Sequence, residues 1–379
     1  MKKIGILTLP LKSNYGGIMQ AFALHKVVGS LGFEPLLINI QFKTNKFVEI
    51  PKLIVKFFFN FLFQKEKLII YPSITQTEHL YSNNIRFIDD YFNKTNEVRT
   101  LSDYNLIDNY KIEGFVVGSD QVWRKEYSKS IDFFNYFFNF LSKNDKVLKI
   151  AYAASFGLDY WQFNKKETDI IKKLLLKFNG ISLRENQGAQ LLLENTGIDS
   201  IDVLDPTLLL NAEFYTSFFK IPKKKNPHLF TYILDDKYYS EKKINEICEI
   251  FNLEKSSLNM TLRKSKLGII KNSNLPFPSV IEWIGHFRNS EFILTDSFHG
   301  MVFSIIFNKK FLVFANKSRG ISRFESLLNK LNLESRLIHD FSQINKNLLD
   351  QEIDYKLVNK LLDKERERSI EFLQFNLSK

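Results

Sequence analysis

Short apolar runs alternate with amphipathic segments along most of the chain. The first run, residues 4–9, leads into a polar, glycine-containing turn and then into apolar residues at helical spacing from 18 to 31. Gly32 fits the end of that helix, and residues 35–40 form the next apolar run. This order predicts a strand, a helix and a second strand parallel to the first.

The same alternation continues through the rest of the chain. Further strands are predicted at residues 112–117, 147–153, 181–183, 201–204, 229–234, 292–295 and 311–314, and helices at 185–195, 241–251, 280–288 and 301–307. Strands that alternate with helices indicate parallel sheets covered on both faces. Because single cores stop growing at about 250 to 300 residues, 379 residues predict two such α/β domains.

The predicted domain boundaries are 1–175 and 176–350. Residues 351–379 contain an amphipathic pattern from about 355 to 375, which predicts a long final helix that packs back on the first domain.

Composition fits a folded protein. At 44% apolar and 25% charged residues, with only 15 glycines and 9 prolines, the chain is neither disordered nor collagen-like. The net charge of +11 raises the alternative of nucleic-acid binding, but acidic residues are interspersed and no zinc-finger, helix-turn-helix or RNA motif occurs. The single cysteine, Cys248, excludes an internal disulfide and favours a reducing compartment, so we expect a cytoplasmic protein.

One segment suggests contact with a membrane. Residues 53–64 are rich in phenylalanine, with polar residues only at 56, 60 and 64, and lysines lie on both sides. The segment is shorter than the roughly 20 residues that span a bilayer. A helix resting on the cytoplasmic face of an anionic membrane through residues 51–71 fits this pattern, and a buried core helix is the alternative.

Polar clusters follow several predicted strands, where open parallel sheets bind ligands. They are Asn14-Tyr15-Gly16-Gly17, Gly118-Ser119-Asp120-Gln121-Val122-Trp123, Ser155-Phe156-Gly157, Arg184-Glu185-Asn186 and Asp296-Ser297-Phe298-His299-Gly300. His299 would lie beside a helix N-terminus, which suits a proton donor or an anion ligand, although a structural histidine next to a capping Asp296 or Ser297 fits as well. Asp120 is placed to accept a hydroxyl proton or to cap a turn.

Arginines at strand ends suit a small anion. Only 11 of the 53 basic residues are arginine, and a guanidinium binds a carboxylate or phosphate through two parallel hydrogen bonds, as lysine does not. Arg184, Arg319 and Arg323 are the candidates. Arg184 could instead pair with Glu185 or Asp205, and Arg319 and Arg323 could belong to a solvated helix start. The other histidines show no metal-ligand spacing, so no metal site is expected.

Taken in order, these clusters resemble the motifs of the polysaccharide pyruvyl transferase family. The resemblance spans roughly residues 4 to 330 and rests on Asn14-Tyr15-Gly16-Gly17 with Gln20 and Ala21, Gly118 to Trp123, Ser155-Phe156-Gly157, Leu183-Arg184-Glu185, Val203-Leu204-Asp205-Pro206-Thr207 and Thr295 to Gly300. It implies two Rossmann-like domains that face a cleft, as in GT-B glycosyltransferases. It also implies transfer of the pyruvyl group of phosphoenolpyruvate onto two hydroxyls of a sugar as a cyclic ketal.

The resemblance assigns roles to residues. His299 and Asp120 are the expected catalytic residues, and Arg184 and Ser297 would bind the donor together with Arg319 and Arg323, which we add from anion chemistry. Acceptor-binding residues would come from the first domain: Asn14, Tyr15, Gly16, Gly17, Gln121 and Trp123. The expected partners are phosphoenolpyruvate as co-substrate, with no further cofactor, and a sugar or lipid-linked oligosaccharide of a bacterial capsule or exopolysaccharide. A GT-B glycosyltransferase with a nucleotide-sugar donor and a non-catalytic glycan-binding protein remain alternatives.

Overall fold

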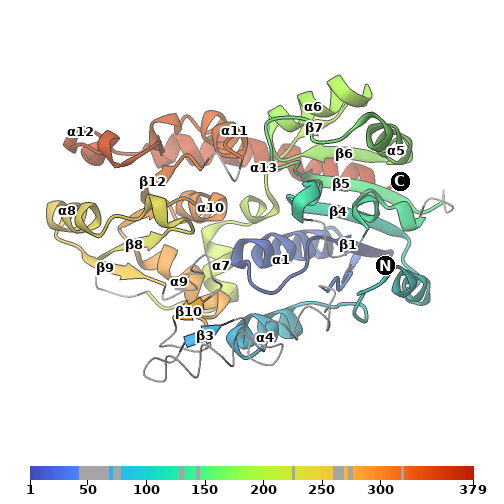
Figure 1. Cartoon of the computed structure of the whole chain (residues 1–379), viewed down its shortest axis with the longest axis horizontal. Coiled ribbons are helices and arrows are strands. Elements are labelled where there is room, and N and C mark those ends of the chain that lie inside the picture. The colour runs from blue at the N-terminus through green and yellow to red at the C-terminus, as the bar shows by residue number, and fades with distance from the viewer. Residues whose placement is uncertain are drawn as a thin grey trace.

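The chain forms two lobes, each built on a parallel sheet flanked by helices (Figure 1). The computed structural model describes residues 1–41, 68–70, 78–127, 132–141, 146–223, 227–258, 269–271, 276–316 and 320–379. The strands are β1 Lys3–Leu7, β2 Glu34–Leu37, β3 Leu68–Ile70, β4 Gly114–Asp120, β5 Leu148–Ala154, β6 Gly180–Leu183, β7 Ile201–Asp202, β8 His228–Tyr232, β9 Glu254–Ser257, β10 Ile269–Lys271, β11 Phe292–Thr295, β12 Lys310–Phe314 and β13 Leu337–Ile338.

The helices cover both sheets. They are α1 Tyr15–Ser30, α4 Ser82–Tyr91, α5 Lys165–Leu175, α6 Asn186–Thr196, α7 Ala212–Phe218, α8 Glu241–Phe251, α9 Val280–Asn289, α10 Phe298–Ile306, α11 Ser322–Lys330, α12 Lys346–Asp350 and α13 Tyr355–Leu377. None of these described helices has the length and apolar character needed to cross a membrane. The membrane-contact prediction for residues 51–71 falls outside the described residues, apart from the backbone of β3.

Strand order explains where a ligand would bind. The first sheet runs β2-β1-β4-β5-β6-β7 and the second β13-β12-β11-β8-β9, with every neighbouring pair parallel. The chain leaves β1 toward β2 and then crosses to the other side of β1 to form β4, and it does the same around β8 with β9 and β11. Ligands of such sheets bind beyond the carboxyl ends of the strands at these switch points. The predicted α/β class with two parallel sheets is confirmed.

The division between the sheets lies later than the sequence suggested. β6 pairs with β5 and β7 pairs with β6, so residues 180–202 belong to the first sheet. The boundary at 175/176 is therefore wrong, and the chain passes to the second sheet between β7 and β8. The sequence pattern did not predict α5, which lies between β5 and β6 of the first sheet.

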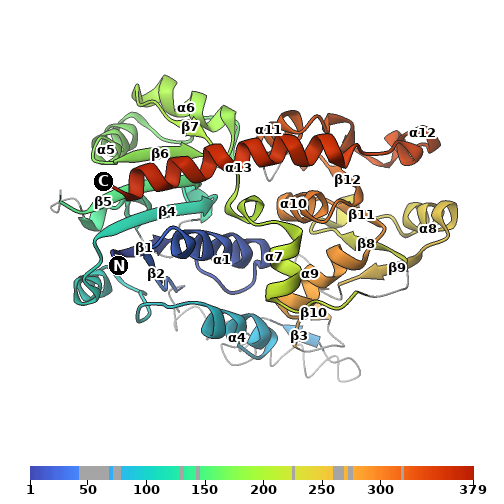
Figure 2. The ribbon, with the colours of Figure 1, turned by 180° about the vertical axis from the view of Figure 1, so that it is seen from behind.

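The last helix, α13, runs across the back of both lobes (Figure 2). On the first lobe, Ser369 Oγ accepts a hydrogen bond from the Leu204 amide at 3.0 Å, and Arg366 Nε donates to the Leu208 carbonyl at 2.6 Å. Glu365 of α13 and Asp202 of β7 both pair with Lys330 of α11. The helix thus ties the segment between the lobes to each of them.

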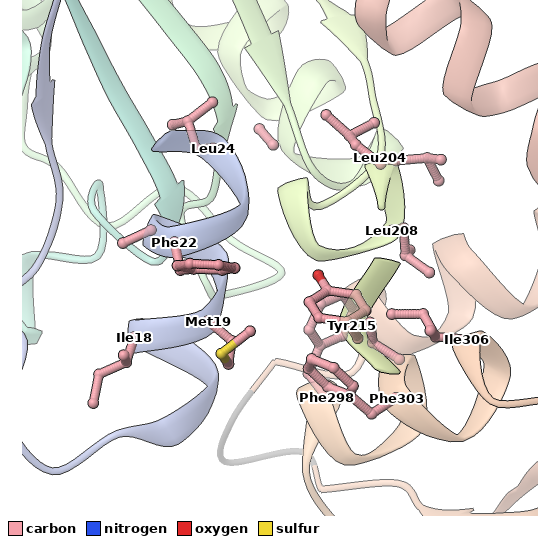
Figure 3. Close-up of a cluster of buried hydrophobic side chains, with 14 of the residues drawn as sticks. Ile18, Met19, Phe22, Leu24, Leu204, Leu208, Tyr215, Phe298, Phe303 and Ile306 are labelled. Carbon is pink, nitrogen blue, oxygen red and sulfur yellow. The ribbon is translucent and has the colours of Figure 1, made fainter. Parts of the chain in front are cut away.

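The two lobes share one apolar core (Figure 3). Met19 and Phe22 of α1 face Tyr215 of α7 and Phe303 of α10, and all four side chains are fully buried. Because side chains of both lobes pack around α1, its first turn has a fixed position relative to the first turn of α10. The candidate active site lies at that junction.

Candidate active site

A pocket of about 380 Å³ lies between the lobes at the switch points of both sheets. Residues of the first lobe that line it lie at or after the ends of β1 and β4, and residues of the second lie at or after the ends of β8, β11 and β12. They are Leu9, Ser13, Asn14, Asp120, Gln121, Tyr127, Tyr232, Leu234, Ser297, Phe298, His299, Arg323 and Phe324. Within the described residues, no group of three or more His, Cys, Asp or Glu side chains is arranged to hold a metal ion.

Three helices begin at this pocket. Asn14 precedes α1, Ser297 precedes α10, and Arg323 lies in the first turn of α11. The Ser297 hydroxyl accepts a hydrogen bond from the Gly300 amide at 3.3 Å, whereas α1 and α11 have no side-chain cap at their N-termini. The first amides of a helix are partly positive and lack intrahelical acceptors. Their convergence makes the pocket attractive to an anion.

His299 lies against the start of α1. A Cβ added to Gly16 would fall 2.1 Å from Nδ1 and 2.3 Å from Cγ of the imidazole, so only glycine leaves room for the ring. On the opposite side, His299 Nε2 lies 3.6 Å from Asp205 Oδ2. The tertiary structure thus holds the imidazole between the first turn of α1 and a buried carboxylate.

Arg184 is committed to two carboxylates instead of facing the pocket. Its Nη1 donates to Asp205 Oδ2 at 2.9 Å and its Nη2 to Asp120 Oδ1 at 3.2 Å, while the side chain is only 1% exposed. Its guanidinium carbon lies 4.5 Å from the centre of the Phe298 ring. The structure therefore does not present Arg184 for two-point donor binding, and the structural pairing with Asp205 that the sequence left open is the one observed.

The carboxylates of this cluster are held ionised. Burial raises the pKa of Asp205, but the neighbouring His299 and Arg184 outweigh that effect and keep it well below its usual value. Burial also opposes ionisation of Asp120, whose pKa is lowered by Arg184 and then by His299 and Arg323. Asp205 Oδ1 additionally accepts hydrogen bonds from the Thr207 amide at 3.1 Å and hydroxyl at 2.7 Å. Asp120 Oδ2 accepts from Asn14 Nδ2 at 3.4 Å.

Among the described residues, Arg323 is the arginine that lines the pocket. Burial and then the nearby Arg184 lower its pKa to about 10, against the opposite effect of Asp120. The guanidinium is therefore still charged at neutral pH. The Glu185 carboxyl lies deeper, accepts a hydrogen bond from Ser155 Oγ at 2.8 Å, and has a pKa raised by burial. Arg319 lies outside the described residues.

The expected acceptor residues divide into two groups. Asn14 and Gln121 line the pocket, and Gly16 and Gly17 admit His299 and the Asn14 side chain close to the α1 backbone. Tyr15 is 1% exposed, with its ring stacked on Trp283 and its hydroxyl donating to the Pro278 carbonyl.

Trp123 does not line the pocket either. It is fully buried, stacks on Phe137 and donates from Nε1 to the Tyr136 carbonyl at 3.0 Å. Trp123 and Tyr15 are therefore core residues in this structure.

Two residues at the site were not proposed from the sequence. Asp205 was noted as a possible partner of Arg184 and as part of the motif Val203 to Thr207, without a role at the site, and the signal that it belongs here was its position three residues after the end of β7. Tyr127 lines the pocket, 38% exposed, with the Arg124 guanidinium 4.5 Å from its ring centre. Nothing in the local sequence marks Tyr127, because it reaches the pocket only through the packing of the loop after β4.

Similar folds occur among enzymes of sugar nucleotides. S. aureus MnaA in a structure with UDP is 13% identical, with a TM-score of 0.52 over 100% of this chain and 97% of that chain. UDP-GlcNAc 2-epimerase from Methanocaldococcus jannaschii is 16% identical, with a TM-score of 0.50 over 97% of this chain and 94% of that one. A putative UDP-N-acetylglucosamine 2-epimerase from Listeria monocytogenes is 11% identical, with a TM-score of 0.50 and coverages of 97% and 90%. At such identities the likeness establishes the GT-B-like fold alone.

Family membership rests on the sequence itself. No curated protein matches the chain. The model of the polysaccharide pyruvyl transferase family matches residues 14–318, which contain every described residue of the pocket except Leu9, Ser13, Arg323 and Phe324. The ordered motifs, the two parallel sheets and the pocket between them agree with that match, and the chain belongs to the polysaccharide pyruvyl transferase family.

Proposed function

We propose that this protein transfers the pyruvyl group of phosphoenolpyruvate onto two hydroxyls of a sugar, forms a cyclic ketal and releases phosphate. The acceptor is a unit of a capsular polysaccharide or exopolysaccharide, or its lipid-linked precursor. The observation that carries the proposal is a small pocket in which three helix N-termini and Arg323 surround His299 and Asp120. Family membership supplies the class of reaction.

The donor fits this pocket by charge. Phosphoenolpyruvate carries a carboxylate and a phosphate on three carbons, and helix N-termini and a guanidinium bind such groups without a metal. Arg184 is already neutralised by Asp120 and Asp205, so donor binding is assigned to Arg323 and the amides at the start of α1, α10 and α11. This replaces Arg184 by Arg323 as the principal side chain that binds the donor.

In the first step, protonated His299 gives a proton to the methylene carbon of the donor, which becomes a methyl group. The first sugar hydroxyl adds to the central carbon and its proton passes to the Asp120 carboxylate. Asp120 is suited to this role because Arg184 keeps it ionised inside a buried site.

In the second step, the bond between the central carbon and the phosphate oxygen breaks while the second hydroxyl bonds to the same carbon. Neutral His299 takes the proton of that hydroxyl, and Asp120 passes its proton to the departing phosphate. Both side chains return to their starting states: over one turnover the two hydroxyls lose one proton each, and the methyl group and phosphate gain one each.

The alternative function is a glycosyltransferase that uses a nucleotide-sugar donor. Ligand binding distinguishes this function from pyruvyl transfer. We expect phosphoenolpyruvate to raise the melting temperature of the purified protein progressively as its concentration increases, with UDP and UDP-GlcNAc having no effect. The activity test is incubation with phosphoenolpyruvate and a panel of synthetic and lipid-linked glycosides, with mass spectrometry for the ketal and an assay for phosphate. Protection by nucleotides alone would contradict the proposed donor.

A further inference from the structure

The two ring nitrogens of His299 have different surroundings. Nε2 is sealed from solvent, has no hydrogen-bond partner within 3.5 Å, and has Asp205 Oδ2 at 3.6 Å. Nδ1 lies on the side of Gly16, at the N-terminus of α1. His299 as a residue lines the pocket and is 6% exposed. One nitrogen therefore faces a buried carboxylate, and the other faces the junction of the two lobes.

We infer that Asp205 is a positioning residue that holds the proton of neutral His299 on Nε2, so that His299 exchanges protons with its ligands through Nδ1. An ionised carboxylate only accepts hydrogen bonds, so an Nε2 lone pair turned toward Asp205 would be repelled, whereas an Nε2 proton is attracted. At 3.6 Å, the contact between Nε2 and Asp205 Oδ2 is longer than a hydrogen bond, and the attraction between the Nε2 proton and the carboxylate is electrostatic.

The surroundings of Asp205 fix it rigidly. Its Oδ1 accepts two hydrogen bonds from Thr207, and its Oδ2 accepts from Arg184 at 2.9 Å and from Ser119 Oγ at 3.2 Å. The side chain is 0% exposed. A carboxylate held by so many donors orients the imidazole and does not itself need to reach the ligand.

The environment of Nδ1 favours the same tautomer. The first amides of α1 present partial positive charge on the Gly16 side, which disfavours a proton on Nδ1 of the neutral ring and favours a lone pair there. The other charged groups that face His299 are Asp120 at the end of β4, which shares Arg184 with Asp205, and Arg323 of α11 across the pocket. When the ring is protonated, Nδ1 is the nitrogen from which a proton can reach a bound donor.

The inference rests on the proposed function for the identity of the donor, but the tautomer is measurable without any substrate. Nitrogen NMR of protein labelled with ¹⁵N-histidine distinguishes protonated from unprotonated ring nitrogens, and the spectrum of His299→Ala assigns the resonances. At a pH where His299 is neutral, we expect its Nε2 to be protonated and its Nδ1 unprotonated. The opposite pattern would overturn the inference whatever reaction the protein catalyses.

Asp205→Asn tests the role of the carboxylate. An amide can face either tautomer, so we expect the His299 resonances to shift toward a mixture of the two forms. With phosphoenolpyruvate and an acceptor found in the glycoside panel, kcat should fall by roughly 10² or more, as general acid–base catalysis is lost, while KM for phosphoenolpyruvate stays within about a factor of three.

Asp202→Asn is the matched control. Asp202 ends β7 three residues before Asp205 and pairs with Lys330 and Arg368, away from His299. This variant should leave the His299 tautomer and kcat unchanged. If Asp205→Asn folds and its His299 spectrum and kcat match those of the wild type, Asp205 has no positioning role. If Asp205→Asn does not fold, the tautomer of the wild-type protein still decides the inference.

Discussion

The imidazole of His299 occupies the space in which any other residue at position 16 would place its Cβ. That Cβ would lie 2.1 Å from Nδ1 and 2.7 Å from the His299 Cβ. The two residues come from different lobes and are separated by 283 positions in the chain. Gly16 therefore sets the distance between the starts of α1 and α10, and with it the shape of the pocket.

Gly16→Ala should impair catalysis more than folding. The added methyl group must displace His299 or separate the helices, and overpacking of this kind costs about 1–3 kcal/mol of stability. We expect turnover to fall at least tenfold in a variant that still unfolds cooperatively. Gly29→Ala in the same helix is the control, because its Cβ would meet only Pro35 at 3.9 Å. Equal activities of the two variants would contradict the proposed contact.

His299→Ala should abolish turnover and leave the fold intact. Loss of a general acid–base side chain lowers rates by about 10² to 10⁴. Circular dichroism and thermal melting test the fold, and phosphate release in the presence of donor and acceptor tests the rate. His339→Ala removes an exposed histidine and should behave as the wild type. Undiminished turnover in purified His299→Ala would remove His299 from the mechanism.

Arg323→Gln should weaken donor binding. A hydrogen bond to a charged group contributes about 1.5–3 kcal/mol, so we expect KM for phosphoenolpyruvate and its dissociation constant to rise roughly tenfold to a hundredfold. Arg86→Gln replaces an exposed arginine of α4 by glutamine in the same way, and it is the control for the loss of one positive charge. Calorimetric titration with phosphoenolpyruvate is the measurement, and identical affinities of both variants would exclude Arg323 as a donor ligand.

Asp205 should stabilise the fold except in acid. Its pKa is lowered in the folded protein, so its contribution is fully present above the unfolded value of about 3.9 and is lost as the pH falls below that value toward the folded pKa. Breaking a buried pair costs about 3–5 kcal/mol. In urea unfolding at neutral pH, the free energy of unfolding of Asp205→Asn should therefore be lower than that of the wild type by about 3–5 kcal/mol. This difference between the two proteins should become smaller below about pH 4. A difference that does not depend on pH would indicate a purely steric effect.

Glu185 should have the opposite pH dependence. Burial raises its pKa in the folded protein, so its contribution is greatest below the unfolded value of about 4.3 and is lost as the pH rises through the folded pKa. Glu185→Gln keeps the hydrogen bond from Ser155 and cannot ionise. In urea unfolding, the free energy of unfolding of Glu185→Gln should therefore rise relative to that of the wild type above about pH 4.3. A difference between the two proteins that does not change with pH would contradict the raised pKa of Glu185.

The sequence by itself determined many of the helices and strands, and it indicated that the polar side chains of the site lie at the carboxyl edge of the sheets. Apolar runs and helical spacing located α8 at residues 241–251 and β11 at residues 292–295, both with the bounds found in the structure. Because parallel strands end at a common edge, polar residues after strands were expected to meet, and Asn14, Asp120 and His299 do line one pocket. Local patterns carry this information because side-chain periodicity follows directly from backbone geometry.

Only the tertiary structure decided which side chains of each cluster face the ligand. Trp123 and Tyr15 lie beside pocket residues in the sequence but point into the core, and Arg184 is turned to Asp120 and Asp205. The contact of Gly16 with His299 joins two lobes, and the assignment of β6 to the first sheet depends on which strand it pairs with. Contacts between segments far apart in the chain follow from how whole domains pack, and no local pattern of residues encodes them.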